Sequence, residues 1–221
     1  MTPYSIDERR FEDSIVHALT GQAPSDAISE EMSGDQVAGP DHKGYLLGRP
    51  EDFDKTLALD RPRFWDFLKT SQPEELDKLK RSSQWRERVL SMYDKQVSRY
   101  GTLHVFRKGL KIDDAHLRMY FPAPTGSSGE VTRKNFELNQ FSVTRQVHFD
   151  RERPGQSIDL VIFLNGMPIA TLELKSELNG QTARHHGIRQ YKMDRDHTQP
   201  LLRFARCLVH FTVDRDEVYM T

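Results

Sequence analysis

The sequence is poor in cysteine and in long apolar runs. Cys207 is the single cysteine among 221 residues, so neither a disulfide framework nor a multi-cysteine zinc site is possible. Such sparse use of cysteine fits a reducing cytoplasm. No eighteen apolar residues follow one another, and the N-terminus, MTPYSIDERRFEDS, is charged within its first turns. We therefore expect a soluble cytoplasmic protein with no membrane partner.

The sequence also lacks an excess of positive charge and a P-loop. Its formal net charge is -1, whereas domains that coat nucleic acid usually carry a clear basic excess. Local contact with DNA stays compatible with this charge if another component holds the duplex. Gly-x-x-x-x-Gly-Lys-Ser/Thr does not occur, so we expect no ATP site of that kind in this chain.

The length suits one domain that folds without disulfides. We expect residues 1–221 to form this domain, with a mainly helical part over about 5–100 and a sheet with helices over about 101–221. IDERRFEDSIVHAL has apolar residues at helical spacing, with Gly21 just past the end. From Gln22 to about Pro50, Gly, Pro, Ser and Asp predict a long surface excursion.

The stretch from Arg61 to Gly101 is predicted to be helical, because its aromatic and aliphatic residues recur at helical spacing. Burial in a core is the favoured interpretation of these aromatic residues, rather than contact with a ligand. The residues on which this prediction depends are Phe64, Phe67, Leu68, Trp85, Val89, Met92, Tyr93 and Val97.

After Gly101 the apolar period changes from 3.6 to 2, which is typical of strands. TLHVFRKG, HLRMYFP and QFSVTRQVHF are predicted strands, separated by the loops PAPTGSSGE and DRERPGQ. SIDLVIFLNGMPIATLELK, at 157–175, reads as a hairpin that turns at Asn-Gly. TARHHGIRQYKMDRD is a predicted helix that Gly187 weakens, and ARCLVHFTVDRDEVYMT is a predicted strand, turn and strand.

The hairpin carries Asp159, Glu173 and Lys175 at the margins of strongly apolar strands. Spacing alone favours a solvated face with an ion pair. A functional interpretation competes with it, because charges at the edge of an apolar sheet are costly unless they have a partner.

The form of the hairpin turn decides whether the two acids meet. A two-residue type I′ turn at Asn165-Gly166 with an unbulged ladder would put Asp159 and Glu173 on opposite faces. A three-residue loop with Gly166 in the left-handed conformation would put them on one face, and so would a bulge near Pro168. We predict an odd loop or a bulge.

If the acids meet, they repel each other unless a cation lies between them. Oxygen ligands without His or Cys select Mg²⁺ or Mn²⁺. A lysine two residues along the same face could orient or deprotonate the attacking water and stabilise developing charge. The arrangement suits attack of water on a phosphodiester.

Asp, a turn and then Glu-x-Lys on the next strand resembles the PD-(D/E)xK nuclease superfamily. NQFSVTRQVHF, SIDLVIFLNGMPIATLELKSELNGQT, IRQYKMDR and LVHFTVD together resemble the N-terminal nuclease domain of the motor (R) subunit of type I restriction enzymes. The resemblance covers most of Tyr100–Thr221 and, more loosely, RRFEDSIVHAL and the helical region. It implies an α/β fold with a central mixed β-sheet flanked by helices, an N-terminal helical elaboration, and Mg²⁺-dependent cleavage of double-stranded DNA.

The resemblance implies roles for particular residues. Asp159 and Glu173 would hold a divalent metal, Lys175 would assist catalysis, and the backbone carbonyl of Leu174 would complete the coordination. Glu12 matches a glutamate on the first helix that often joins such sites, although it could equally be exposed in a local ion pair.

The same family tends to carry a Gln-x-x-x-Tyr motif on the helix after the hairpin. Here Gln190 lies directly beside Tyr191 and Gly187 occupies the position four before the tyrosine, so the motif is shifted. Gln190 and Tyr191 are candidate DNA-binding residues on this basis.

Basic residues on the same stretch allow two interpretations. A solvated surface is one, and contact with DNA phosphates near the cut site is the other. The residues concerned are Arg184, Arg189, Lys192 and Arg195.

The resemblance also implies partners outside this sequence. ATP would be bound by motor domains of the same polypeptide, and we expect the sequence to be a fragment of that longer chain. Methyltransferase and specificity subunits would read the DNA. A non-catalytic DNA-clamping or docking module on the same fold is an alternative. An autonomous repair or resolvase-type nuclease is a third, which the absence of a basic excess disfavours.

Overall fold

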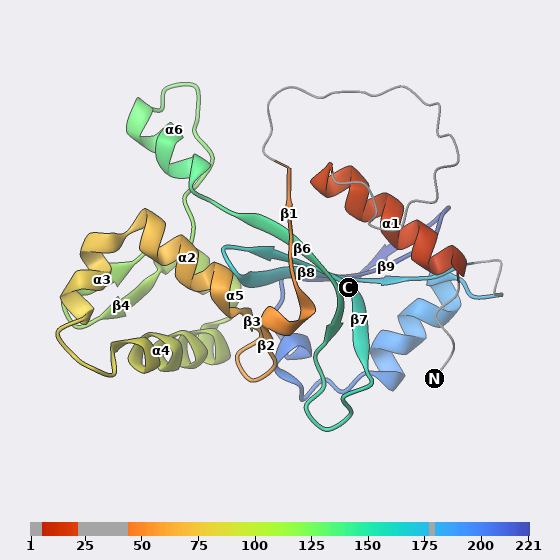
Figure 1. The fold of residues 1–221 in the computed structure, drawn as a ribbon. Helices are drawn as coiled ribbons and strands as arrows, with labels where there is room; N and C mark the ends of the chain where they lie inside the picture. Colours follow the sequence, from red (N-terminus) through yellow and green to blue (C-terminus); the bar gives the residue numbers. More distant parts are fainter. Residues whose placement is uncertain (1–5, 22–43, 177–179) are drawn as a thin grey trace.

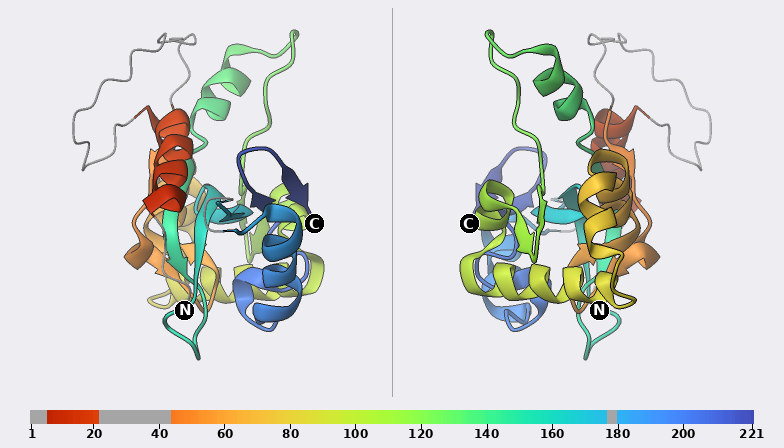
Figure 2. Two further views of the ribbon diagram at one scale, coloured as in Figure 1. Left: turned by 90° about the vertical axis from the view of Figure 1, so that its right-hand side faces the viewer. Right: turned by 90° about the vertical axis from the view of Figure 1, so that its left-hand side faces the viewer.

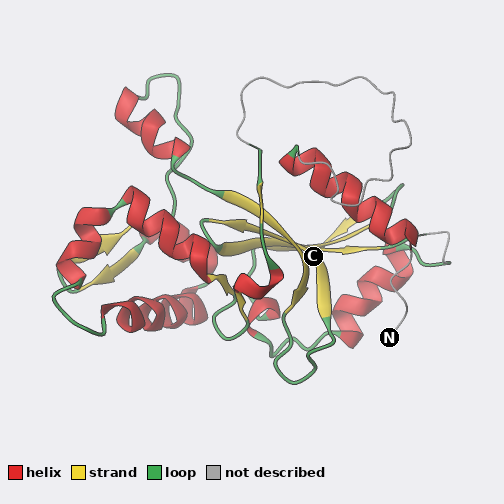
Figure 3. Cartoon of the chain, in the orientation of Figure 1, coloured by secondary structure: helices red, strands yellow, loops and turns green. Residues whose placement is uncertain are grey.

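The computed structural model describes residues 6–21, 44–176 and 180–221. In these residues six strands form one mixed sheet in the order β1-β6-β7-β8-β9-β10 (Figures 1 and 3). Neighbouring strands are antiparallel except for β1 with β6 and β8 with β9. The expected α/β fold with a central mixed sheet is confirmed. The strands are β1 (Leu46–Leu47), β6 (Phe141–His148), β7 (Ser157–Leu164), β8 (Met167–Leu174), β9 (Val209–Val213) and β10 (Val218–Met220).

Helices cover both faces of this sheet (Figure 2). On one face lies α1 (Ile6–Thr20), which ends where Gly21 (φ 68°) donates its N–H to the carbonyl oxygen of His17, as the sequence predicted. On the other face lies the helical segment 183–194, in which the π-helical turns η3 (Ala183–Gly187) and η4 (Gln190–Asp194) are joined by an α-helical step.

Each face has its own apolar cluster. Val16 of α1 packs with Val143, Leu160 and Leu174, together with partly buried residues such as Phe11 and Ile15. The opposite cluster joins the sheet to the 183–194 helix and to η5 (Pro200–Leu202). Its members are Phe53, Ala58, Val147, Phe149, Ile158, Val161, Phe163, Tyr191, Leu201 and Leu202.

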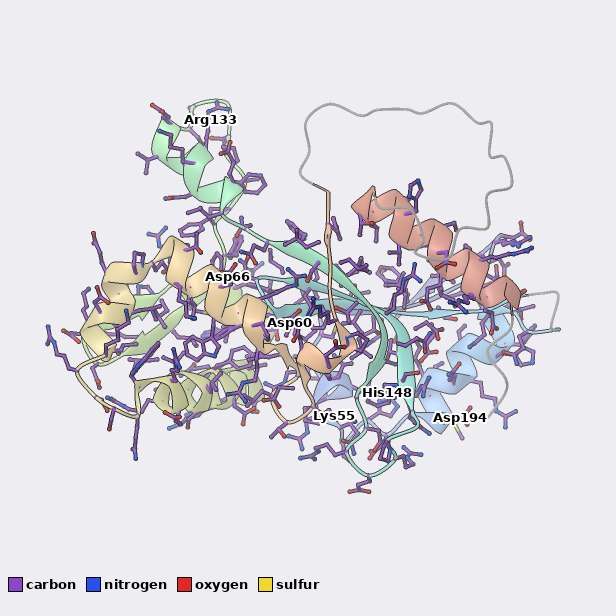
Figure 4. The ribbon with its side chains drawn as sticks, viewed as in Figure 1. Lys55, Asp60, Asp66, Arg133, His148 and Asp194 are labelled. Carbon is purple, nitrogen blue, oxygen red and sulfur yellow. The ribbon has the colours of Figure 1, made fainter. Side chains whose placement is uncertain are left out.

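A second, mainly helical region packs beside the sheet (Figure 1). Its largest buried side chains include Phe64, Phe67 and Tyr93, so core burial of these aromatic residues is confirmed. Asp60 caps the first helix by accepting from the N–H of Arg63 (Figure 4). The elements are η1 (Pro50–Asp52), β2 (Phe53–Asp54), β3 (Leu59–Asp60), α2 (Arg61–Ser71), α3 (Pro73–Leu79), α4 (Trp85–Tyr100), α5 (Thr102–Lys108), β4 (Leu110–Ile112) and β5 (Ala115–Leu117).

Two predicted segments are wrong or incomplete, and one helix was not predicted. TLHVFRKG is helix α5, because its buried residues Val105 and Phe106 turn one helical side toward the helical core. HLRMYFP is a strand only at its start, in β5, and α6 (Glu130–Glu137) follows the PAPTGSSGE loop without having been predicted.

The predicted excursion contains a short strand. β1 pairs with β6 inside the stretch that the sequence assigned to the surface, and 22–43 lies outside the described residues. Of the helices in the described ranges, none has the length and apolar character needed to cross a membrane.

Candidate functional site

The hairpin turn has two residues. Asn165 (φ 54°) and Gly166 (φ 79°) are both left-handed, and Leu164 pairs with Met167 across them. This is the type I′ geometry that Asn-Gly favours. The three-residue loop that was one predicted alternative is therefore wrong.

The other alternative, a bulge near Pro168, is confirmed. Phe163 pairs with Pro168, but the next residue of β7, Ile162, pairs with Ala170. Ile169 is the extra residue on β8, next to a proline that cannot donate to the ladder. From this point to the end of the hairpin, every residue of β8 faces the side opposite to that of an unbulged ladder.

The shifted register brings the two acids together. Extending the pairing of Leu160 with Leu172 by one residue sets Asp159 directly opposite Glu173. Directly opposed residues have Cβ atoms about 5 Å apart. The N–H of Leu174 donates to Oδ2 of Asp159 at 2.7 Å, which fixes that carboxylate at the end of the ladder.

Glu173 is buried, with 1% of its surface exposed. Arg195 donates to its Oε1 from Nε at 3.0 Å and from Nη2 at 2.6 Å, and Lys175 Nζ lies 4.0 Å from Oε2. Burial, and then the neighbouring Asp159, raise the pKa of Glu173 to about 8, although Arg195 and Lys175 oppose the shift. The site thus holds a carboxyl group whose charged form is disfavoured mainly by burial, although two cations lie beside it.

Arg195 contributes more than one contact. Its side chain is 8% exposed, donates to the carbonyl oxygen of Ser157 at 2.7 Å and to Oε1 of Gln156 at 3.3 Å, and stacks over the ring of Phe149. The interpretation of Arg195 as part of a solvated surface is wrong. Its sequence neighbours gave no sign of this, because its partners lie 22 and 38 residues away.

Gln146 was missed in the sequence. It lies opposite Asp159 in the register of β6 and β7, and its backbone is left-handed (φ 46°) within a strand. Its Nε2 donates to Oε2 of Glu12 at 2.8 Å and to Oδ1 of Asp159 at 3.3 Å. Glu12 is 2% exposed, so it points inward from α1 and is not a surface residue.

The 183–194 helix reaches the hairpin through Tyr191. Its hydroxyl group lies 2.7 Å from Oγ1 of Thr171, which also lies 2.6 Å from Nδ1 of His210. Tyr191 is buried, and Gln190 is partly buried. Their role in DNA binding stays a prediction.

Close packing explains why the Gln-x-x-x-Tyr motif is shifted. A Cβ atom on Gly187 would lie 1.6 Å from Oγ1 of Thr212 on β9. No larger residue fits four positions before Tyr191 unless the helix moves. The glycine is thus required by contact between the helix and the sheet.

The predicted phosphate contacts lie on the surface of this helix. Arg184, Arg189 and Lys192 are exposed, and contact with DNA by any of them stays a prediction. A cleft of about 710 Å³ lies at α2, far from the charged end of the hairpin. Two of its cationic side chains are already paired, Arg61 with Asp54 and Arg63 with Asp60, which makes it a weaker candidate for phosphate.

The acid pair fits a hard divalent cation in its chemistry. In the described ranges no group of three or more His, Cys, Asp or Glu is arranged to hold a metal ion. Mg²⁺, however, commonly takes only one or two carboxylates and keeps several waters. The buried Glu173 opposite Asp159 is such a pair, and burial together with the neighbouring Asp159 raises the pKa of Glu173. The carbonyl of Leu174 stays a predicted ligand.

These features define an α/β domain in which a bulged hairpin of a mixed sheet brings two acids and a lysine to one place. The family model for the N terminus of the type I restriction enzyme R protein matches residues 63–221. The match covers more than half of the chain, so the chain belongs to this family, which supports a nuclease-like domain. No curated protein gives a significant match.

Proposed function

We propose that the chain is a Mg²⁺- or Mn²⁺-dependent endonuclease domain that cleaves double-stranded DNA within a type I restriction complex and reads no sequence itself. The observation that carries the proposal is the bulge at Ile169, which sets Asp159 opposite Glu173 and leaves Lys175 two residues further along the same face. Without the bulge the acids would face opposite sides of the sheet.

The side chains divide the work between them. Asp159 and Glu173 would hold the cation, which when bound supplies positive charge that stabilises the transition state of phosphodiester hydrolysis. Lys175 is 7% exposed and lies 4.0 Å from Glu173, a position from which it can orient or deprotonate a water molecule. Arg195 holds Glu173 by one oxygen and leaves Oε2 for another partner.

Other components would supply what this chain lacks. Motor domains of the same polypeptide would bind ATP and move the duplex, and methyltransferase and specificity subunits would select the DNA. The formal net charge of -1 agrees with a domain that receives DNA from partners.

Plasmid cleavage by the complete complex with ATP and Mg²⁺ tests the proposal. Asp159→Ala, which removes a metal ligand, and Lys175→Ala, which removes the acid–base group, should each lower cleavage by about 100-fold or more, while ATP hydrolysis continues. Lys111→Ala, at an exposed lysine on β4, is the control and should cut at the wild-type rate. Equal cleavage by all variants would reject the proposal.

One observation favours a non-catalytic clamping module instead. Arg195 already occupies Oε1 of Glu173 with two hydrogen bonds, as an internal cation would in a site that needs no metal. In that case Asp159→Ala would leave cleavage unchanged, whereas assembly or DNA retention by the complex would depend on surface residues such as Arg189. Measuring cleavage and DNA retention on the same variants separates the two functions.

A further inference from the structure

We infer that Gln146 is a positioning residue of this site, whose carboxamide aligns Glu12 and Asp159 for a divalent cation. The inference rests on the proposed function. Gln146 belongs to β6, outside the hairpin that carries Asp159, Glu173 and Lys175.

The contacts of the amide are complete. Its Nε2 has two hydrogens and two carboxylate acceptors, Glu12 at 2.8 Å and Asp159 at 3.3 Å. Its Oε1 accepts from the hydroxyl group of Ser157 at 2.9 Å. The reverse orientation would turn the amide oxygen toward two carboxylates, so the surroundings determine which end faces them.

The amide links segments that are distant in the chain. Glu12 lies 134 residues before Gln146, on the helix that covers one face of the sheet. Asp159 lies on β7, directly across from Gln146. Gln146 thus connects α1 to the acid pair, next to Arg145, which pairs with Glu12 at 3.7 Å and with Asp13 at 2.5 Å.

A neutral donor suits this place better than a cation would. Lysine or arginine here would neutralise the carboxylates and compete with a metal ion. A carboxamide donates to both acids and leaves their negative charge in place. Partners of this kind that orient metal ligands typically change metal affinity by about 10- to 100-fold when they are removed.

The backbone supports a specific role for Gln146. Its φ of 46° is left-handed, which is unfavourable for a side chain of this size inside a strand. Strained residues of this kind cluster at functional sites. The side-chain alternation of β6 also changes near Gln146, because Val143 and Val147, four residues apart, lie in apolar clusters on opposite faces.

Mn²⁺ binding to the 221-residue chain, measured by the loss of the free-ion electron paramagnetic resonance signal, tests the inference. Gln146→Gly removes the amide and relieves the left-handed strain together. We expect its melting temperature without metal to be no lower than that of the wild type, and its Mn²⁺ dissociation constant to rise about tenfold. Gln146→Leu keeps a similar size but donates to neither acid, and should also bind Mn²⁺ more weakly.

Asp113→Gly is the matched control, because it relieves the same kind of strain (φ 52°) in the turn between β4 and β5. Its dissociation constant should equal that of the wild type. An unchanged dissociation constant in Gln146→Gly overturns the inference, and so does a wild-type chain that binds no Mn²⁺. Cleavage by the complete complex tests the proposed function separately, because Asp159→Ala can abolish cutting whether or not Gln146 matters.

Discussion

The two ends of the β7–β8 hairpin treat buried polar groups in opposite ways. At the turn, Asn165 is 1% exposed and all its partners are neutral. At the other end, Glu173 is equally buried, but its neighbours include a second carboxylate and two cations. One end satisfies its polar groups, and the other keeps like charges together.

Hydrogen bonds from three separate segments of the chain hold the turn. The side chain of Asn165 donates to the carbonyl oxygen of Met119 and to Oδ1 of Asn139, and accepts from the N–H of Gln140. Gly166 accepts from the N–H of Asp60 at the start of α2. Such complete networks fix one arrangement of the backbone.

The polar groups at the charged end have less favourable surroundings. The pKa of Glu173 is raised, the backbone of Gln146 is strained, and Lys175 is 4.0 Å from its nearest acid oxygen. The difference teaches that buried polarity alone does not mark a functional site. What sets the charged end apart is a second carboxylate beside a buried one, which is the kind of feature that makes it a candidate site.

Gly166→Ala should have the largest effect on stability. An added Cβ would lie 2.5 Å from the carbonyl oxygen of Asp60 and 2.5 Å from the backbone nitrogen of Phe64, at a φ of 79°. We expect the free energy of unfolding to fall by about 3 to 5 kcal/mol, the sum of left-handed strain and overpacking. Urea denaturation measures this loss.

Gly21→Ala is the control for the strain alone. Gly21 has a φ of 68° but nothing within 4 Å of an added Cβ. The free energy of unfolding should therefore fall by only about 1 kcal/mol in this variant. Equal losses at the two positions would show that the turn is not tightly held by α2, and the comparison of the two ends would fail.

Asn165→Ala should have the next largest effect. It removes three side-chain hydrogen bonds and leaves buried partners on Met119, Asn139 and Gln140. A loss of about 3 kcal/mol is expected, since each net hydrogen bond contributes about 1 kcal/mol. Asn165→Gly keeps the left-handed backbone accessible, so the difference between the two variants, by the same denaturation, gives the share that comes from conformation. A loss below about 1 kcal/mol in both would contradict the network.

The sequence predicted the sheet well where the apolar alternation is long. The strands at Phe141–His148, Ser157–Leu164 and Met167–Leu174 are all confirmed. TLHVFRKG misled because only seven residues separate Gly101 from Gly109, which is too short to distinguish period 2 from period 3.6. Packing on the helical core decides its structure.

The candidate site was only half predictable. Asp159, Glu173 and Lys175 stand out because charges interrupt apolar strands. Whether the turn or a bulge shifts the pairing by one residue decides if they share a face of the hairpin. Gln146 and Arg195 look like ordinary surface residues in the sequence, because each acts through contacts made by folding.

His210 contacts Thr171, between the turn and the charged end of the β7–β8 hairpin. Its titration tests whether polar groups in the middle of the hairpin have the partners that they need. Burial, with a smaller effect of His197, lowers the pKa of His210 to about 4. A base whose pKa is lower in the folded state binds its proton preferentially when unfolded. The contribution of the buried neutral ring to stability is therefore present above the ordinary histidine pKa of 6.5 and is lost as the pH falls toward 4.

We expect the wild type to lose about 2 kcal/mol more than His210→Gln between pH 7 and pH 4.5. Urea denaturation at both pH values measures this, with His185→Gln at an exposed position as control. Identical pH profiles for the wild type and His210→Gln would mean that burial of His210 gives no preference for the neutral ring.

Asp159→Asn should have the smallest effect on stability, and of opposite sign. Asparagine can still accept from the N–H of Leu174, and it removes the carboxylate that helps to raise the pKa of Glu173. The free energy of unfolding at pH 8 should stay unchanged or rise by up to about 1 kcal/mol, because a like-charge contact disappears.

Stabilisation by Mg²⁺ should be lost in Asp159→Asn, although the variant is at least as stable as the wild type without metal. Mg²⁺ should raise the melting temperature of the wild type, because a ligand that binds only the folded state stabilises it, and this rise should be lost in Asp159→Asn. Thermal denaturation with and without Mg²⁺ measures both effects. If Asp159→Asn is clearly less stable than the wild type without metal, Asp159 has a structural role like that of Asn165. A more stable variant that ignores Mg²⁺ would show that this end of the hairpin keeps its charges for binding, at the expense of stability.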